Sequence, residues 1–144
     1  MSKVLTIYLF LTATVAQSKQ ICVSVDDLPT VHYGENNQDE ITKKLIAHFK
    51  KYAIAAIGFV NEGKLYASAT LKKERVDLLQ QWLNGSYGLG NHTFGHTDYL
   101  QATFTSFIHV MLEGAQITPA MSKQAGLPWW YFLLSAYWLD TGQL

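Results

Sequence analysis

The sequence predicts an α/β fold in which parallel strands alternate with helices. Three features predict it: a β-branched apolar run at residues 21–25, a helical repeat of apolar residues after it, and a second apolar run at residues 53–60. The chain has 144 residues, 49% of them hydrophobic, and a formal net charge of zero. This composition fits one globular unit, and it gives no sign of a nucleic-acid partner, which would favour a basic chain.

The N-terminal segment has the layout of a secretory signal peptide. Lys3 precedes an apolar run, and small residues surround the expected cleavage point after Ala16. We therefore expect a signal peptide at residues 1–16 and a domain at residues 17–144, exported to the periplasm or the outside of a bacterial cell. The run is too short and too rich in threonine for a stable membrane span, so the alternatives are a buried first strand or a short anchor. Cys22 is the only cysteine, so no internal disulfide can form.

The first half of the domain has the pattern strand, helix, strand. Residues 21–25 predict a buried strand that delivers Asp26 and Asp27 at its end, because the proline that follows breaks the strand. Residues 53–60 predict a second buried strand, and residues 61–63 its exit loop. Between the strands lies a helix with acidic residues near its start and basic residues near its end. Its inward face is Ile41, Leu45, Ile46 and Phe49.

The second half continues the alternation. A helix is predicted over residues 74–83, with Gly85 just past its end, and a short strand over residues 87–90. Thr118 is expected to cap a short last helix that stops at Gly126, with a proline in its first turn. Apolar residues turned inward on the earlier helix are Val76, Leu79 and Leu83. Apolar residues at helical spacing after the histidines are Leu100, Phe104, Phe107, Ile108, Met111 and Leu112.

Two histidines four residues apart, His92 and His96, can close on one metal ion, and the pair Asp26 and Asp27 can complete the site. Hydrolytic zinc sites have three protein ligands and an open position for water, so one Asp and two His suffice. Thr93 stands where a zinc-protease helix needs a glutamate, so that alternative lacks its general base. One carboxylate of the pair can then bind metal while its neighbour takes a proton from the water. The sequence therefore predicts a metal-dependent hydrolase.

Each motif also has a plainer interpretation. Residues 26–29 fit an ordinary strand-to-turn exit, and His92 and His96 fit two solvated loop histidines. Both motifs follow predicted strands, and α/β folds bind ligands at the carboxyl ends of parallel strands, so their joint occurrence favours a metal site. The histidines without a partner motif are expected on the surface or on helix faces: His32, His48 and His109.

The two motifs resemble those of the polysaccharide deacetylases with a NodB-homology domain, also called carbohydrate esterase family 4. Residues 23–29 (VSVDDLP) resemble the first motif of the family and residues 89–96 (LGNHTFGH) the second. The resemblance covers residues 21–142 and implies a distorted β/α barrel. It implies Asp26 as the catalytic base and, as ligands of a divalent metal, usually zinc, Asp27, His92 and His96. The implied reaction removes N-acetyl groups from a carbohydrate polymer or oligosaccharide of the peptidoglycan or chitin type.

The third motif of the family, an Arg, a Pro and an aromatic residue, is not matched. Residues 130–142 occupy its place, and Leu133 stands where the Arg is expected. The chain ends at Leu144, before the later strands and the catalytic acid of the family, so we expect an incomplete barrel without an assigned acid. Two alternatives stand beside a working deacetylase. One is a truncated pseudo-enzyme that binds metal or glycan with little or no turnover, and the other is an exported α/β fragment whose His and Asp residues are structural.

Overall fold

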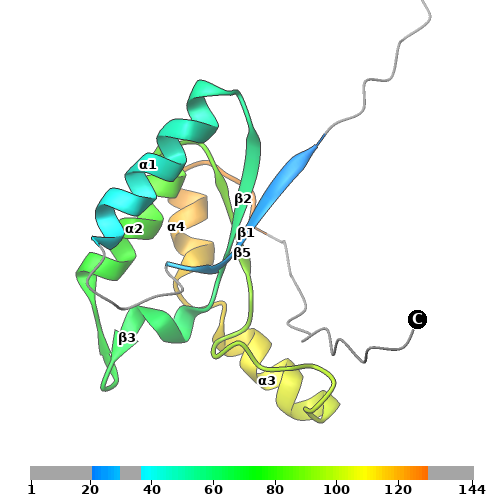
Figure 1. Cartoon of the computed structure of the whole chain (residues 1–144). Helices are drawn as coiled ribbons and strands as arrows, with labels where there is room; N and C mark the ends of the chain where they lie inside the picture. The colour runs from blue at the N-terminus through cyan, green and yellow to red at the C-terminus, as the bar shows by residue number, and fades with distance from the viewer. Residues whose placement is uncertain (1–20, 30–36, 130–144) are drawn as a thin grey trace, which may run out of the picture.

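The structure is a computed structural model that describes residues 21–29 and 37–129. Its centre is a parallel sheet in the order β1-β2-β5 (Figure 1). The strands are β1 (Cys22–Leu28), β2 (Ala55–Val60) and β5 (Gly88–Asn91), and the helices are α1 (Gln38–Lys51), α2 (Lys73–Asn84), α3 (Phe104–Glu113) and α4 (Thr118–Gln124). The predicted α/β fold with a parallel sheet is confirmed, whereas the three strands form an open sheet and no barrel closes within the described residues.

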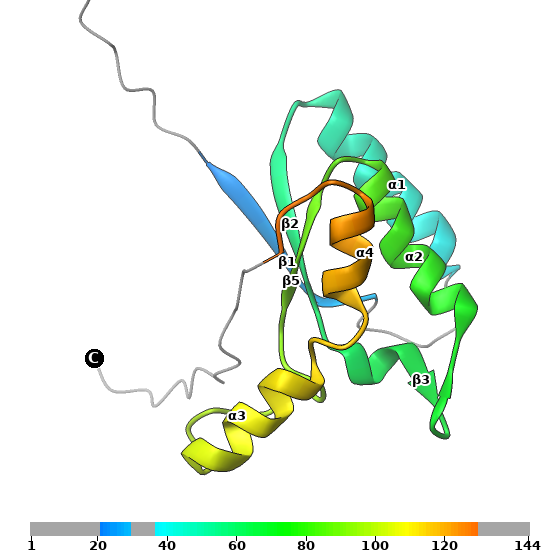
Figure 2. The ribbon, with the colours of Figure 1, turned by 180° about the vertical axis from the view of Figure 1, so that it is seen from behind.

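One side of the sheet is covered by α1, α2 and α4, as the two opposite views show (Figures 1 and 2). The core between these layers is built around Trp82, whose ring meets the rings of Phe49 and Tyr87 edge-on with centroids 6.0 Å away from each. Leu79 and Leu83 of α2 are buried as the helical spacing predicted. Such close aromatic packing anchors α1 and α2 to the sheet and to each other.

The alternation of side chains along β1 separates the two faces of the sheet. Val23 and Val25 pack against the core, whereas Cys22, Ser24 and Asp26 are exposed. The predicted strand covered residues 21–25, whereas β1 continues through both aspartates to Leu28; the predicted break at the proline is confirmed, since the strand ends directly before Pro29. The strand extends because the apolar Leu28 enters the core, where it is only 5% exposed.

Helix α1 begins as its sequence indicates. Asn37 caps it by accepting a hydrogen bond from the Glu40 N–H at 3.3 Å. Hydrogen bonds from Lys43 and then from Gln81 of α2 lower the pKa of Asp39 below its ordinary value. The inward position predicted for Ile41 was wrong, since this side chain is 52% exposed. Ile46 and Phe49 are buried as predicted, and Thr42 is buried in place of Ile41.

The exit of β2 was predicted as a loop, and it is a 3-10 helix, η1 (Glu62–Leu65), followed by a small hairpin of β3 (Tyr66–Ala67) and β4 (Thr70–Leu71). No periodicity signals so short a helix. Its burial was equally unforeseen, because Asn61 and Glu62 are both fully buried although their side chains are polar. Buried polar groups of this kind need hydrogen-bond partners, which connects η1 to the rest of the fold.

Helix α3 does not pack on the sheet, and in both views it lies beyond the lower end of the strands (Figures 1 and 2). Of its predicted inward residues, Phe107 is buried, in contact with the ring of Tyr99 at 4.9 Å between centroids. Leu100, Phe104 and Leu112 were expected inward and are 69%, 73% and 58% exposed, so that expectation was wrong. The helix packs on the loop before it and therefore buries a narrow stripe. In residues 21–29 and 37–129, no helix is long and apolar enough to cross a membrane.

Candidate metal centre

A bulge in β1 shapes the aspartate pair. Val25 pairs with Gly58 of β2 and Leu28 pairs with Val60, so β1 carries one residue more than its partner over this stretch. Asp27 lies in this bulge with a backbone φ of +65°, in the left-handed region. Bulges break the alternation of a strand and re-aim a side chain. Without the extra residue, the side chain after Val25 on the core face would be a carboxylate; with it, that place is taken by an apolar leucine.

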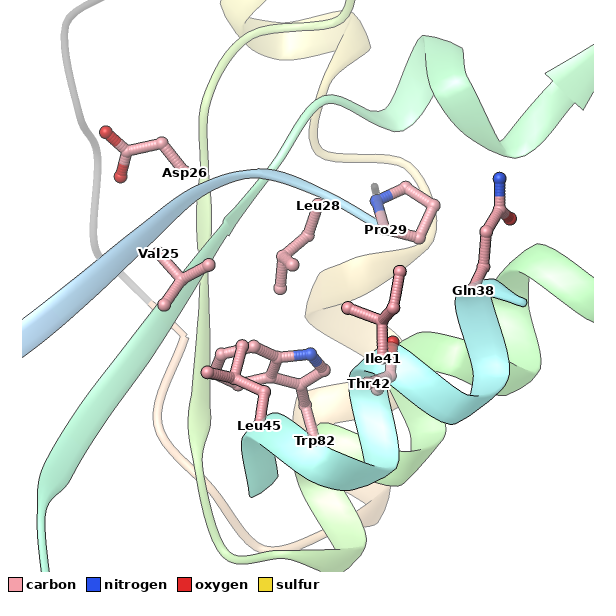
Figure 3. A pocket seen from close by; sticks show the side chains of 9 residues that line it. All are labelled: Val25, Asp26, Leu28, Pro29, Gln38, Ile41, Thr42, Leu45 and Trp82. Carbon is pink, nitrogen blue, oxygen red and sulfur yellow. The ribbon is translucent and has the colours of Figure 1, made fainter. Parts of the chain in front are cut away.

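The bulge sends the two carboxylates of the pair to different surroundings. Asp26 is exposed, and it lies at the rim of a cleft of about 150 Å³ between β1 and α1. Its carboxylate points to the side of the strand opposite Leu28, Leu45 and Trp82, which form the apolar wall of the cleft (Figure 3). Asp27 is instead half-buried at the end of the sheet. The bulge therefore keeps Asp27 out of the core-facing position that strict alternation along β1 would give it.

The two histidines lie in the turn that follows β5, residues 92–97, which we call the histidine loop. His92 is the first residue past the strand, and its N–H still donates to the Val60 carbonyl at 2.9 Å. Thr93 and His96 both adopt positive φ, +65° and +57°. Left-handed backbone is costly for a β-branched residue and persists only where surrounding contacts impose it. Such strain at the loop is typical of functional sites.

Contacts from two sides hold the histidine loop. Asn61 donates from Nδ2 to the His92 carbonyl, and the Gly63 N–H donates to the Phe94 carbonyl at 2.8 Å. On the other side, Gly114 at the end of α3 approaches so closely that an added Cβ would lie 2.6 Å from the Thr93 carbonyl carbon. The loop is thus clamped between η1 and α3, which explains how two strained residues are maintained in it.

The strand ends bring Asp27, His92 and His96 together. One ligand atom of each lies within 4.8 Å of those of the others. The His92 and His96 rings meet edge-on with centroids 4.8 Å apart, and His96 Nε2 lies 3.8 Å from Asp27 Oδ1. Around a tetrahedral zinc with bonds of about 2.1 Å, ligand atoms are about 3.4 Å apart. A modest rotation of the side chains therefore brings the three ligand atoms to the spacing that one zinc ion needs. Two imidazoles and one carboxylate are a donor set that suits zinc.

The three candidate ligands differ in how deeply they are buried. His92 is 3% exposed and lies 6.5 Å from the ring of Phe59, measured between centroids, whereas Asp27 and His96 are half-buried. A cation held here would be reached from the side of Asp27 and His96. The remaining side of the group therefore opens toward solvent, as a hydrolytic site needs for water and substrate.

The carboxylate of Asp27 also has a cationic partner. Lys64 of η1 donates from Nζ to Asp27 Oδ1 at 2.7 Å and to the Asp27 backbone carbonyl at 3.2 Å. Both side chains are 23% exposed, so the pair is shielded from much of the solvent. No local signal marked Lys64, because it is 37 residues away from Asp27 in the chain.

A second unforeseen residue is Glu62, whose carboxylate caps the start of α4. It accepts hydrogen bonds from the backbone N–H groups of Gln116, Ile117 and Thr118 and from the Thr118 hydroxyl. Thr118 was predicted to cap this helix, and that was wrong, because Ile117 precedes the helix and Thr118 is its first residue. A carboxylate at a helix start is favoured by the unpaired N–H groups and the helix dipole.

A family model described as polysaccharide deacetylase matches residues 14–133 of the chain. The chain belongs to the polysaccharide deacetylase family. The resemblance drawn from the two motifs is thereby confirmed. Membership in this family indicates a hydrolase and implies an acetylated polysaccharide as substrate. No curated protein and no solved structure gives a significant match to the chain.

For a polysaccharide deacetylase, the group of Asp27, His92 and His96 is the place where a metal is expected, since a metal at such a group is typical of the family. Two other histidines lie apart from it on helix surfaces: His48 contacts the Lys44 carbonyl on α1, and His109 faces Glu113 on α3. His32, the signal peptide at residues 1–16 and the third-motif segment at residues 130–142 lie outside the described residues.

Proposed function

We propose that this deacetylase-family chain is a metal-dependent hydrolase that removes N-acetyl groups from a carbohydrate polymer. The observation that carries the proposal is the convergence of one carboxylate and two imidazoles at the carboxyl end of a parallel sheet. Family membership makes an acetylated polysaccharide the substrate class. A polymer of the peptidoglycan or chitin type supplies the N-acetyl groups that this chemistry needs.

In this proposal Asp27, His92 and His96 hold the metal, which we propose to be zinc. A bound divalent metal supplies Lewis acidity toward the acetamide carbonyl and lowers the pKa of water near it. The protein orients the site through the histidine loop, because Asn61 and Gly63 fix the carbonyls of His92 and Phe94. A fixed ligand backbone restricts the imidazole rings to positions near one another, which favours a single geometry for the bound ion.

Asp26 is proposed as the general base. It is adjacent in sequence to a metal ligand, exposed, and directed away from the core by the alternation of side chains along β1. An ionised carboxylate of this kind accepts the proton of the attacking water when it comes within hydrogen-bond distance of that water. The reaction adds water to the amide carbon, breaks the carbon–nitrogen bond, and releases acetate and a sugar amine.

The experiment that tests the proposal measures zinc and acetate on the same samples. The full chain is purified, its zinc affinity is determined by competition with a chromogenic chelator, and acetate release from an N-acetylglucosamine oligomer is assayed. His92→Ala and Asp27→Asn should lose stoichiometric zinc, whereas Asp26→Asn should keep zinc and lose acetate release. His109→Ala and Asp77→Asn are matched controls, since both residues are exposed on helices.

Each other outcome has a defined meaning. Zinc binding without acetate release by the unaltered chain would identify a pseudo-enzyme with a retained metal site. Absence of zinc binding would indicate that the His and Asp residues are structural and would contradict the proposal. Loss of zinc in His109→Ala to the same extent as in His92→Ala would show that the assay reports general unfolding.

We also propose that the protein is exported, with residues 1–16 as its signal peptide. The support is the sequence layout of this segment, a lysine followed by an apolar run and small residues. Expression of the full chain in a Gram-negative host should yield periplasmic protein whose N-terminus is Gln17. Cytoplasmic protein that retains Met1 would contradict export.

A further inference from the structure

Lys64 lies outside the predicted metal ligands and contacts one of them, Asp27, through two hydrogen bonds. Its ammonium group bridges two atoms of the same residue, the Asp27 carboxylate at 2.7 Å and the Asp27 carbonyl at 3.2 Å. A lysine that bonds both the side chain and the backbone of one residue restricts the rotation between them. The contact therefore fixes the orientation of the carboxylate relative to the strand.

Asp27 needs such a restraint because its backbone is unusual. It lies in the β1 bulge with φ of +65°, where an L-residue is disfavoured and where the regular ladder of backbone hydrogen bonds is interrupted. Lys64 supplies a charged donor to the carbonyl at this point. Hydrogen bonds that involve a charged group are stronger than neutral ones, so this contact stabilises the left-handed conformation more than a backbone N–H would.

Lys64 is itself held in place by the residues around η1. Arg75 of α2 donates from Nη1 to the Lys64 carbonyl at 2.8 Å and to the Tyr66 carbonyl at 2.6 Å. The Lys64 N–H donates to the Asn61 carbonyl at 2.9 Å. The backbone of Lys64 is thus bonded to α2 through Arg75 and to Asn61, which also holds the histidine loop.

We propose that Lys64 is a positioning residue of the metal centre, which holds Asp27 in its metal-binding conformation and thereby sets the affinity for the ion. This inference rests on the proposed metal site. Lys64 bonds one carboxylate oxygen and leaves the remaining lone pairs of Asp27 for the metal. Partners that orient a ligand in this way typically contribute 10–100-fold to metal affinity.

The alternative role for Lys64 is competition with the metal, which would lower the affinity for the ion. A cation beside the carboxylate competes with a metal for the same negative charge, and its removal would then tighten zinc binding. The bond to the backbone carbonyl and the left-handed bulge favour the positioning role, because a competitor needs no contact with the backbone. The sign of the change in affinity separates the two roles.

The test compares zinc affinity, measured by chelator competition, in the full unaltered chain and in Lys64→Met, Lys64→Arg and Lys123→Met. Lys64→Met preserves the length of the side chain and should weaken zinc binding by about 10–100-fold. Lys64→Arg should restore binding to within about threefold, since a guanidinium also donates to a carboxylate and a carbonyl. Lys123→Met removes the same charge from an exposed position on α4 and should leave the affinity unchanged.

A second test measures the interaction between Lys64 and Asp27 without metal, so that it does not depend on zinc affinity. The melting temperatures of Lys64→Met, Asp27→Asn and the double variant should be non-additive, because the two single changes remove the same interaction. Unchanged or tighter zinc binding in Lys64→Met, beside normal binding by the unaltered chain, would overturn this inference alone. Additive melting temperatures would overturn it as well, whereas failure of the unaltered chain to bind zinc would overturn the proposed function and the inference together.

Discussion

Glu62→Gln is the substitution for which the structure gives the clearest magnitude. The carboxylate is fully buried and accepts from four donors in the turn that starts α4. Its Oε1 accepts from Ile117 N, Thr118 N and the Thr118 hydroxyl, and its Oε2 from Gln116 N and Ile117 N. Only donors surround both oxygens. A glutamine must therefore point its own NH₂ group at a backbone N–H, whichever way its amide is turned.

Of the two orientations of the glutamine amide, the one that places NH₂ at the position of Oε2 costs less stability. The half-buried Gln116 N–H then lacks its partner at a cost of about 1 kcal/mol, and each of the three bonds to Oε1 loses about 1 kcal/mol with the charge. We expect Glu62→Gln to destabilise the chain by about 4 kcal/mol, a large share of a typical total of about 5–15 kcal/mol. Because Glu62 lies between Asn61 and Gly63, which hold the histidine loop, zinc affinity should fall as well.

Urea unfolding followed by tryptophan fluorescence measures this change, since Trp82 of α2 is buried against Phe49 of α1. With a denaturant slope of about 2 kcal/mol per molar urea, the midpoint should drop by about 2 M. Glu74→Gln is the matched control, because Glu74 is exposed near the start of α2 and should change stability by no more than about 0.5 kcal/mol. A loss below about 1 kcal/mol in Glu62→Gln would refute the account of Glu62 as a buried helix cap.

Three further predictions concern the histidine loop and its surroundings. Gly114→Ala should destabilise the chain by about 2 kcal/mol and weaken zinc binding, because its methyl group would lie 2.6 Å from a backbone atom of Thr93; chemical unfolding and chelator competition measure both effects. Asn61→Ala should cost about 2 kcal/mol in the same unfolding assay, since it leaves the buried His92 carbonyl without its amide donor. Phe104→Ser should raise solubility in a precipitation assay and change the melting temperature by about 2 °C or less, because the ring is 73% exposed.

The alternation of elements was readable from the sequence because each element carries its own local pattern. The β-branched run before the aspartates, the apolar face of α1 and the glycine after α2 depend on neighbours within a few residues. The errors lie where distant contacts override such a pattern. Ile41 and Phe104 are apolar at helical spacing and yet exposed, because the partner surface that would cover them is not set by the helix itself.

The candidate ligands were also predictable, since Asp27, His92 and His96 belong to two short motifs that each follow a strand. That these motifs meet depends on the parallel order β1-β2-β5, which places the carboxyl ends of β1 and β5 at one edge of the sheet. The residues that support the site carried no signal. Lys64 and Glu62 act through partners 37 and 54 to 56 positions away, and polar residues after a strand predict only a loop.

The α/β class, the family and the identity of the residues that converge follow from the sequence alone, because these depend on local periodicity and on motifs of a few residues. The different surroundings of Asp26 and Asp27 become visible only in the folded chain. Strict alternation along a strand would direct one of them into the apolar core, and the bulge opposite Gly58 and Val60 avoids this by placing Leu28 there. In the bulge, Leu28 joins the same core cluster as Trp82, and Lys64 bonds Asp27 from 37 residues away, and such contacts between distant residues exist only after the chain has folded.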